Sequence, residues 1–273
     1  MDHRLSFLGR SRPGHSRPGC CALALAALSA CGSPDAGLAL GHSEQAILRG
    51  QVDREHPQVL LLANQAGFLC TGTLIQVRQQ TGFLLTAAHC VTEEDPGATR
   101  LPPEQFVVLA GTDFRDSTDV FAVDEIRVHP GYDGSFAQND IAVVRLDLGD
   151  SPPPTAIPPL SAEEDALAVN DRLLLVGYGQ TEGDGENSLR RHVSREILDL
   201  DPQLVAYTQE DGKGTCFGDS GGPGLVSVRG QERVASVTSG GVDADERCEG
   251  GFGVGMRVSA FSAFIEGALS GDN

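Results

Sequence analysis

Basic residues are scarce in this chain of 273 residues. Lysine and arginine together number 20, against 38 aspartates and glutamates, which gives a formal net charge of −18. A protein this acidic does not bind nucleic acid by neutralising phosphates, so we expect no nucleic-acid partner. The acidity is explained by solubility, which a net charge far from zero favours.

Long apolar segments and long helical patterns are absent as well. The body of the chain has short apolar runs separated by clusters of proline, glycine and aspartate, with no alternating helices. This pattern predicts an all-β architecture and counts against an α/β-hydrolase, which needs helical crossovers between its strands. Helical spacing of Phe261, Phe264, Ile265 and Leu269 predicts one amphipathic helix, over about residues 261–270. The predicted strands are Val59–Ala63, Leu69–Ile75, Gly82–Thr86, Phe106–Ala110, Val120–Val128, Ile141–Leu146, Leu173–Gly177, Val193–Leu198, Gly224–Val228, Val234–Thr238 and Gly253–Val258.

The cysteines lack any Cys-x-x-Cys pair, which argues against a four-cysteine metal site. We expect no metal and no cofactor. Four of the seven cysteines lie in the body of the chain, and four cysteines allow three disulfide pairings. Disulfides indicate an oxidising compartment. These four cysteines are Cys70, Cys90, Cys216 and Cys248.

The N-terminal residues have the layout of a secretory signal. Residues 1–19 carry four arginines, and the apolar segment that follows, Cys20 to Ala30, is far too short to span a bilayer as a permanent helix. We therefore expect a signal peptide over residues 1–30 and an exported protein. The segment ends Leu28-Ser29-Ala30-Cys31, which resembles the lipobox of bacterial lipoproteins. That resemblance implies lipidation of Cys31 and a pro-segment or linker over residues 31–46. Ordinary secretion, with cleavage near Ala30 or Ala39, is the alternative.

The most informative run, residues 215–223, reads Thr-Cys-Phe-Gly-Asp-Ser-Gly-Gly-Pro. Glycines on both sides of Ser220 let the backbone bend tightly and leave N–H groups uncovered. A serine nucleophile needs such an open approach, donors for the oxyanion that forms, and a base nearby. Gly218-x-Ser220-x-Gly222 also fits the nucleophile elbow of α/β-hydrolases, and alone it is a weak signal.

The base and its orienting acid are found upstream of this serine. His89 lies in Thr-Ala-Ala-His-Cys after an apolar run, and Asp140 opens the hydrophobic strand that follows Asn139. Singly, each has an ordinary structural explanation, as a packed histidine or a turn residue. Together they follow the order histidine, aspartate, serine, and from about Ile47 to its end the chain resembles the trypsin/chymotrypsin-like serine proteases.

The resemblance implies a fold of two six-stranded β-barrels, over about residues 47–150 and 160–260, within a protease domain spanning 47–273. The proline-rich stretch 151–159 is the expected linker between them. The resemblance also implies the disulfides Cys70–Cys90 and Cys216–Cys248. Further, it implies that the catalytic triad of His89, Asp140 and Ser220 lies in the cleft between the barrels, with the backbone N–H groups of Gly218 and Ser220 as the oxyanion hole.

Two further features of the family are carried over. Proteolytic activation would create an α-amino group at Ile47, which pairs with the buried Asp219; Arg49 departs from the usual glycine of that N-terminal sequence. In the specificity pocket, Gly214 stands at the floor where trypsins have an aspartate, Phe217 at the rim, and Gly240 and Gly253 at walls expected to be open. Thr238 is expected to hydrogen-bond Asp140.

These residues predict a monomeric serine endopeptidase, made as an exported zymogen, that forms an acyl-enzyme intermediate on polypeptide substrates. Cleavage is expected after uncharged, small to medium apolar residues, since a substrate Arg or Lys would lack a charge partner at Gly214. A separate activating protease is an expected partner, and contact with a membrane is expected only through a lipid anchor. Two alternatives remain: a catalytically silent surface binding module of the same fold, and a serine esterase.

Overall fold

A computed structural model describes residues 47–93, 95, 97–150, 154–181, 187–242 and 248–271. The predicted signal peptide, the lipobox cysteine Cys31 and the segment 31–46 lie outside these residues. Within the described part of the chain, every helix is too short or too polar to cross a membrane.

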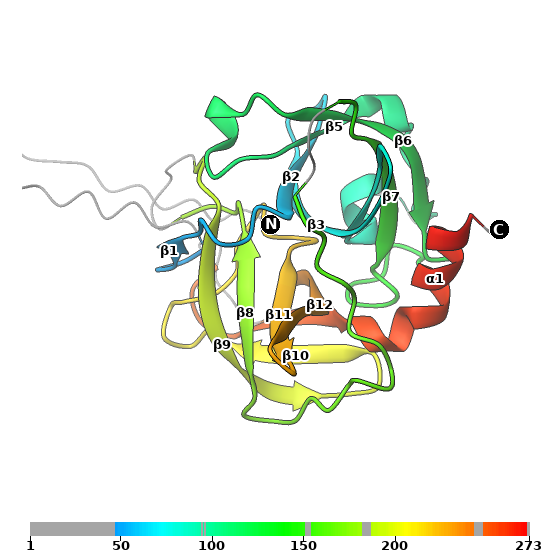
Figure 1. Ribbon diagram of the computed structural model, residues 1–273. Helices are drawn as coiled ribbons and strands as arrows, with labels where there is room; N and C mark the ends of the chain where they lie inside the picture. Colours follow the sequence, from blue (N-terminus) through cyan, green and yellow to red (C-terminus); the bar gives the residue numbers. More distant parts are fainter. Residues whose placement is uncertain are drawn as a thin grey trace, which may run out of the picture. The chain divides into compact units, whose positions relative to one another are not determined.

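The first barrel is a closed antiparallel sheet with strand order β2-β3-β4-β7-β6-β5 (Figure 1). Its strands are β2 (Val59–Asn64), β3 (Leu69–Arg78), β4 (Thr81–Thr86), β5 (Phe106–Leu109), β6 (Val120–Val128) and β7 (Ala142–Asp147). The first half of β6 alternates exposed and buried residues, as a strand with one face on a core should. Two short 3-10 helices, η2 (Pro103–Gln105) and η3 (Phe114–Asp116), lie in the connections around β5.

The second barrel has the strand order β9-β10-β13-β12-β11-β8, and pairing of β8 with β9 closes it. Its strands are β8 (Arg172–Gly177), β9 (Arg191–Leu200), β10 (Leu204–Thr208), β11 (Pro223–Val228), β12 (Gln231–Val242) and β13 (Phe252–Arg257). The short β1 (Gln51–Val52) adds to the outer edge of β9. The chain then passes through η4 (Val258–Phe261) into the helix α1 (Ser262–Ser270).

The all-β prediction of two six-stranded barrels and a C-terminal helix is confirmed. Two strands escaped the sequence analysis, namely β1 and β10. β1 lies within the range 47–150 but pairs with β9 of the second barrel, so the chain crosses between the barrels just before β2. The proline-rich stretch 151–159 lies between β7 and β8, the strands that end one barrel and begin the other; its first three residues are outside the described part.

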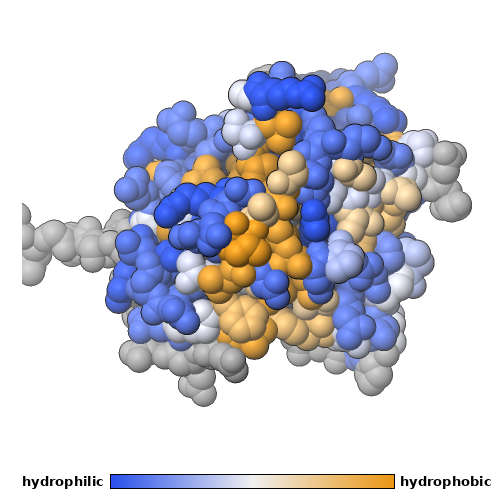
Figure 2. All heavy atoms as spheres, turned by 90° about the horizontal axis from the view of Figure 1, so that it is seen from below, coloured by the Kyte–Doolittle hydropathy of each residue, from blue (hydrophilic) through white to orange (hydrophobic). Residues whose placement is uncertain are grey.

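The first strand and the last helix of the described residues each pack on the barrel that is more distant in sequence. β1 joins the second barrel, whereas α1, drawn in red in Figure 1, packs on the first. Arg78 on β3 donates a hydrogen bond of 2.7 Å to the carbonyl of Leu269, and the ring of His129 meets Phe261 and Phe264 edge to face. Figure 2 shows one face of the molecule, where hydrophilic residues flank a band of hydrophobic ones.

A buried charge network fastens the segment after β1 to the start of β9. Asp53 is fully buried and accepts hydrogen bonds from the ring of His56 at 2.6 Å, from His192 at 3.0 Å and from Arg190 at 3.3 Å. The other ring nitrogen of His56 lies 3.0 Å from Glu232. A buried carboxylate tolerates loss of solvent when it is paired and hydrogen-bonded in this way.

This network predicts a pH-dependent contribution to stability. Burial opposes protonation of His56, but its bonds to Asp53 and Glu232 outweigh burial and raise the pKa of His56 above its usual 6.5. The stabilisation is therefore complete below pH 6.5 and is lost as the pH rises through the raised pKa. We expect His56→Asn to lower the free energy of unfolding more at pH 5.5 than at pH 9, measured by urea denaturation. An equal loss at both pH values would contradict this account.

Candidate active site

His89 lies on the single turn η1 (Ala88–Val91), directly after the buried strand β4. Its ring Nδ1 lies 2.7 Å from Asp140 Oδ2, and its backbone N–H donates to Asp140 Oδ1 at 2.9 Å. Two contacts from one residue to both carboxylate oxygens hold the imidazole in a single orientation. Because Nδ1 faces the carboxylate, it carries the proton, and Nε2 is left as the proton acceptor.

Asp140 is buried at the first barrel's edge, two residues before β7 begins, and receives a third bond from the second barrel. The hydroxyl of Ser239 on β12 donates to Asp140 Oδ2 at 2.6 Å. Burial opposes ionisation, but the bonds from His89 and Ser239 outweigh it and hold the pKa of Asp140 below its usual value. The carboxylate is therefore charged at neutral pH and holds the His89 ring by its hydrogen bond.

The expectation that Thr238 bonds Asp140 is wrong by one residue. The pairing of β12 with β13 shifts register between Thr238 and Gly240, and this bulge turns the Ser239 side chain towards Asp140. Thr238 is buried, and its side chain bonds the phenol of Tyr207 instead. The β12 residue that faces Asp140 is therefore Ser239, and Gly240 and Gly241 follow it along the strand.

The loop carrying Ser220 is held against the first barrel by Thr71 on β3. The backbone N–H of Thr71 donates to the carbonyl of Ser220 at 2.8 Å, and its hydroxyl donates to the carbonyl of Gly218 at 2.8 Å. Gly218 and Gly221 have φ angles of +98° and +81°, which side chains disfavour. A β-carbon at Gly221 would also lie 2.9 Å from the backbone nitrogen of Ala87, so only glycine allows the two barrels to approach so closely.

The backbone N–H groups of Gly218 and Ser220 donate to no other residue in the described part of the chain. Both residues are partly exposed and line the same hollow, so two unused donors beside one serine offer a site for an incoming oxygen. These are the two groups that the sequence analysis assigns to the oxyanion hole.

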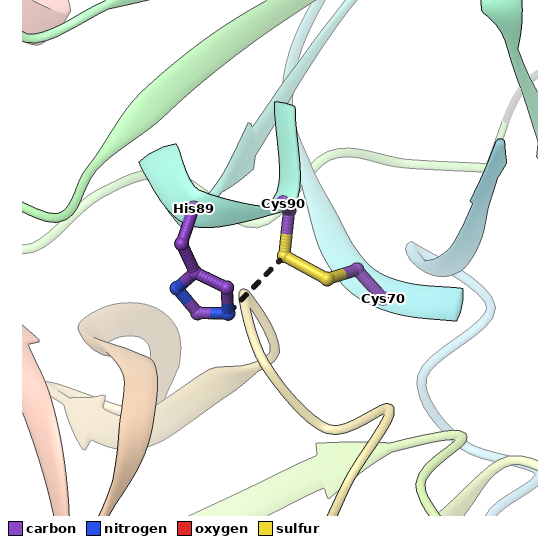
Figure 3. Close-up of side chains that lie close together, drawn as sticks. All are labelled: Cys70, His89 and Cys90. Carbon is purple, nitrogen blue, oxygen red and sulfur yellow. Dashed lines mark hydrogen bonds between the residues drawn. A yellow bond between two sulfur atoms is a disulfide. The ribbon is translucent and has the colours of Figure 1, made fainter. Parts of the chain in front are cut away.

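One sulfur atom links the surroundings of the histidine and the serine. Cys90 Sγ lies 3.8 Å from His89 Nε2 (Figure 3). It also lies 3.7 Å from the carbonyl oxygen of Ser220. This sulfur belongs to the disulfide Cys70–Cys90 and has no proton to donate, so both are packing contacts and not hydrogen bonds. The sulfur therefore lies between the imidazole ring and the serine loop. The second expected disulfide, Cys216–Cys248, is present as well.

The cluster of Cys70, His89 and Cys90 has the spacing of a metal site, because its ligand atoms lie within 4.8 Å of one another. Its chemistry does not fit. Both sulfurs are bonded to each other, and metal binding by cysteine requires a thiolate.

Asp219 is fully buried beneath the serine loop without a cationic side chain beside it among the described residues. Within the described ranges, its carboxylate accepts bonds only from backbone N–H groups, that of Gly179 at 2.7 Å and that of Cys216 at 2.9 Å. Burial raises the pKa of Asp219 to about 7, although both hydrogen bonds act in the opposite direction. A carboxyl group in this state lacks a positive partner.

The residues nearest the predicted new N-terminus are buried, and one of them pairs with the segment that leads into the serine loop. Ile47 and Leu48 are completely buried, and Leu48 pairs with Gly214 in an isolated antiparallel bridge. Ile47 has a φ of +43°, in the left-handed region that β-branched residues avoid.

Two adjoining hollows border this site, and Phe68 lines both. One has a volume of about 560 Å³, with Ser220, Gly218 and the 62% exposed Phe217 in its wall; the other, of about 630 Å³, holds His89. Phe217 is thus an exposed wall residue of the first hollow, and its place at the rim of the specificity pocket stays a prediction.

The expectation of open walls at Gly240 and Gly253 is wrong. A β-carbon at Gly240 would come within 2.7 Å of the ring of Phe136. Beside Gly253 and Gly214, the space is filled by Tyr207 and Gln209. The sequence analysis missed both of these residues because it missed β10, which carries Tyr207 and ends immediately before Gln209.

Comparison with known proteins agrees with this geometry. The family model described as trypsin matches residues 48–265, so the chain belongs to the trypsin family. Serine protease SP24D of Anopheles gambiae is 31% identical over 62% of this chain and 62% of its own length. Serine protease Hayan of Drosophila melanogaster is 29% identical over 82% of this chain, and granzyme M of Rattus norvegicus is 28% identical over 67%. The match covers 39% of Hayan and 74% of granzyme M.

The bond from Ser239 to Asp140 predicts a measurable difference between neighbouring hydroxyls. Ser239→Ala removes a donor to a buried carboxylate and should lower kcat/KM for a peptide substrate by about 10- to 150-fold, since such bonds are worth about 1.5–3 kcal/mol. Thr238→Val, which keeps the shape of its side chain, should have a smaller effect. A larger loss in Thr238→Val than in Ser239→Ala would restore Thr238 as the partner of Asp140.

Proposed function

We propose that the chain is a serine endopeptidase whose nucleophile is Ser220. The observation that carries the proposal is the His89–Asp140 pair, oriented by hydrogen bonds from both barrels, beside a serine loop with two unused backbone donors. Membership of the trypsin family supports it. The proposal keeps the histidine, aspartate and serine that the sequence analysis predicts, and the bond between His89 and Asp140 supports two of these roles.

In the proposed reaction, His89 Nε2 removes the proton from the Ser220 hydroxyl as its oxygen attacks the scissile carbonyl. The imidazolium that forms is stabilised by Asp140 and then gives this proton to the leaving amine. Water repeats the sequence to release the acid product from the acyl-enzyme. The backbone N–H groups of Gly218 and Ser220 bind the oxyanion, and loss of one such donor typically costs about 3 kcal/mol of transition-state stabilisation.

Specificity for uncharged residues follows from Gly214, which puts no carboxylate at the pocket floor. A substrate Arg or Lys would lose its hydration there without gaining an ionic partner. We therefore assign cleavage after small to medium apolar residues.

Activation is assigned to cleavage before Ile47. The new α-amino group would supply the positive charge that Asp219 lacks, and burial makes this pairing strong. Cleavage also removes the preceding carbonyl, so the strained φ of Ile47 no longer exists. The docking of Leu48 against Gly214 supports this assignment, because it ties the activation segment to the pocket floor.

Export of the zymogen, with Cys31 as a lipid anchor, is the remaining part of the proposal. The relatives named above are insect and mammalian proteins, and the anchor is proposed from the lipobox-like residues alone. No cysteine occurs between Gly32 and Leu69, so no disulfide would tether residues 31–46 after cleavage before Ile47. Activation would then release the protease from the membrane.

Covalent labelling tests the nucleophile. A fluorophosphonate should label the activated protein, and Ser220→Ala should abolish labelling because the attacking oxygen is gone. His89→Ala should reduce it strongly, which a role in packing alone would not predict. Absence of labelling in the wild type would favour a silent binding module, whereas turnover of esters without any turnover of peptides would favour an esterase.

N-terminal sequencing of the active species tests activation and anchoring together. We expect active protein to begin at Ile47 and to fractionate as soluble. The precursor should remain with membranes and incorporate palmitate unless Cys31 is replaced by alanine. Active, membrane-retained protein that begins at Cys31 would refute the release.

A further inference from the structure

The space beside the serine loop is bounded by three stretches of the second barrel. Residues 214–217 lead into the loop, and β12 is joined to it by hydrogen bonds from Gly221 N to Thr238 O at 2.8 Å and from Thr238 N to Gly222 O at 2.9 Å. In the sheet, Gly241 of β12 pairs with Gly253 of β13, which pairs in turn with Tyr207 of β10. This register places Tyr207 on the row of glycines that forms the wall.

The absent side chains of Gly214 and Gly253 leave space that the side chain of Gln209 occupies. A β-carbon on Gly214 would lie 2.6 Å from Gln209 Oε1, and one on Gly253 would lie 2.7 Å from the same atom. The amide of Gln209 therefore lies between the proposed floor and the proposed wall. A β-carbon on Gly253 would also overlap the ring of Tyr207.

Gln209 is fixed in this position by its hydrogen bonds. Its Oε1 accepts from the backbone N–H and the hydroxyl of Thr215, at 3.0 and 2.9 Å. Its Nε2 lies 3.4 Å from the carbonyl oxygens of Thr215 and Cys248. All the donors and acceptors of the amide are used, and the residue is 1% exposed, so no polar substrate group is left a partner there.

Tyr207 completes the same unit. It is fully buried, and its hydroxyl lies 2.9 Å from the hydroxyl of Thr215. Displacing either side chain would break bonds inside a closed space and leave buried polar groups without partners.

We propose that Gln209 and Tyr207 form a fixed plug that makes the pocket shallow, so that glycine or alanine is accepted on the acyl side of the scissile bond and larger residues are rejected. The inference deepens the endopeptidase function proposed above and rests on it. It assigns substrate choice to Tyr207 on β10 and to Gln209 immediately after this strand, rather than to the loop residues around Ser220.

The experiment compares peptides that differ only in the residue before the scissile bond: Gly, Ala, Val, Leu and Phe. For the wild type we expect kcat/KM to fall by about 100-fold or more from Ala to Leu, because the extra methylene groups meet a filled pocket. Gln209→Ala should raise the ratio of Leu to Ala cleavage about tenfold or more by emptying the space beside Gly214. Gln231→Ala is the matched control, since it makes the same substitution at an exposed position at the start of β12 and should leave the ratio unchanged.

Ratios within one variant do not depend on how much of that variant is folded. Wild-type cleavage after Leu or Phe as fast as after Ala would overturn the plug, as would an unchanged ratio in Gln209→Ala. Failure of the proposed function is a different result, seen as absence of fluorophosphonate labelling. In that case, binding of product peptides ending in Ala or Leu to Ser220→Ala still decides, because product binding needs no chemistry. Tighter binding of the Ala product supports the plug, and equal binding refutes it.

Discussion

The carboxylate of Asp140 must lie between two barrels that are separate hydrogen-bonded sheets, and the rest of the site depends on this placement. His89 and Asp140 belong to the first barrel, whereas Ser239 and Ser220 belong to the second. The bond from Ser239 to Asp140 therefore aligns the acid of one half with the strand that flanks the nucleophile of the other. Thr71 of the first barrel makes the reciprocal connection, since it donates hydrogen bonds to the carbonyls of Gly218 and Ser220 in the second barrel.

Two buried aspartates show how the environment sets charge. Asp140 has donors from both barrels that outweigh its burial, and its pKa lies below the usual value. Asp219 has only two backbone donors, and burial raises its pKa to about 7. The first is ready to support an imidazolium, whereas the second needs a cation that the intact chain does not place beside it among the described residues. This contrast gives the activation proposal an electrostatic basis independent of any motif.

The differences between the sequence analysis and the structure lie at the pocket. β10 was missed although turn residues at 201–202 and 211–212 flank Leu204–Thr208, and its strand character is fixed by pairing with β9 and β13. Because β10 was missed, the sequence analysis also missed Tyr207 and Gln209, which fill the space left by the glycines at positions 214 and 253. A glycine in a sequence marks an absent side chain, and it does not tell which other side chain moves into the space. The bulge between Thr238 and Gly240 misled the analysis in a similar way, by shifting which hydroxyl faces Asp140.

The sequence by itself determined an all-β fold with a C-terminal helix, and its resemblance to the trypsin-like proteases implied the two barrels and the proposed roles of a histidine, an aspartate and a serine. Short apolar runs specify strands through local periodicity, and the three motifs occur in one order along the chain. Only the tertiary structure decided the partner of Asp140, the protonation of Asp219 and the filling of the pocket. These depend on strand register, burial and close approach between distant segments, which arise when the chain packs and which no local pattern encodes.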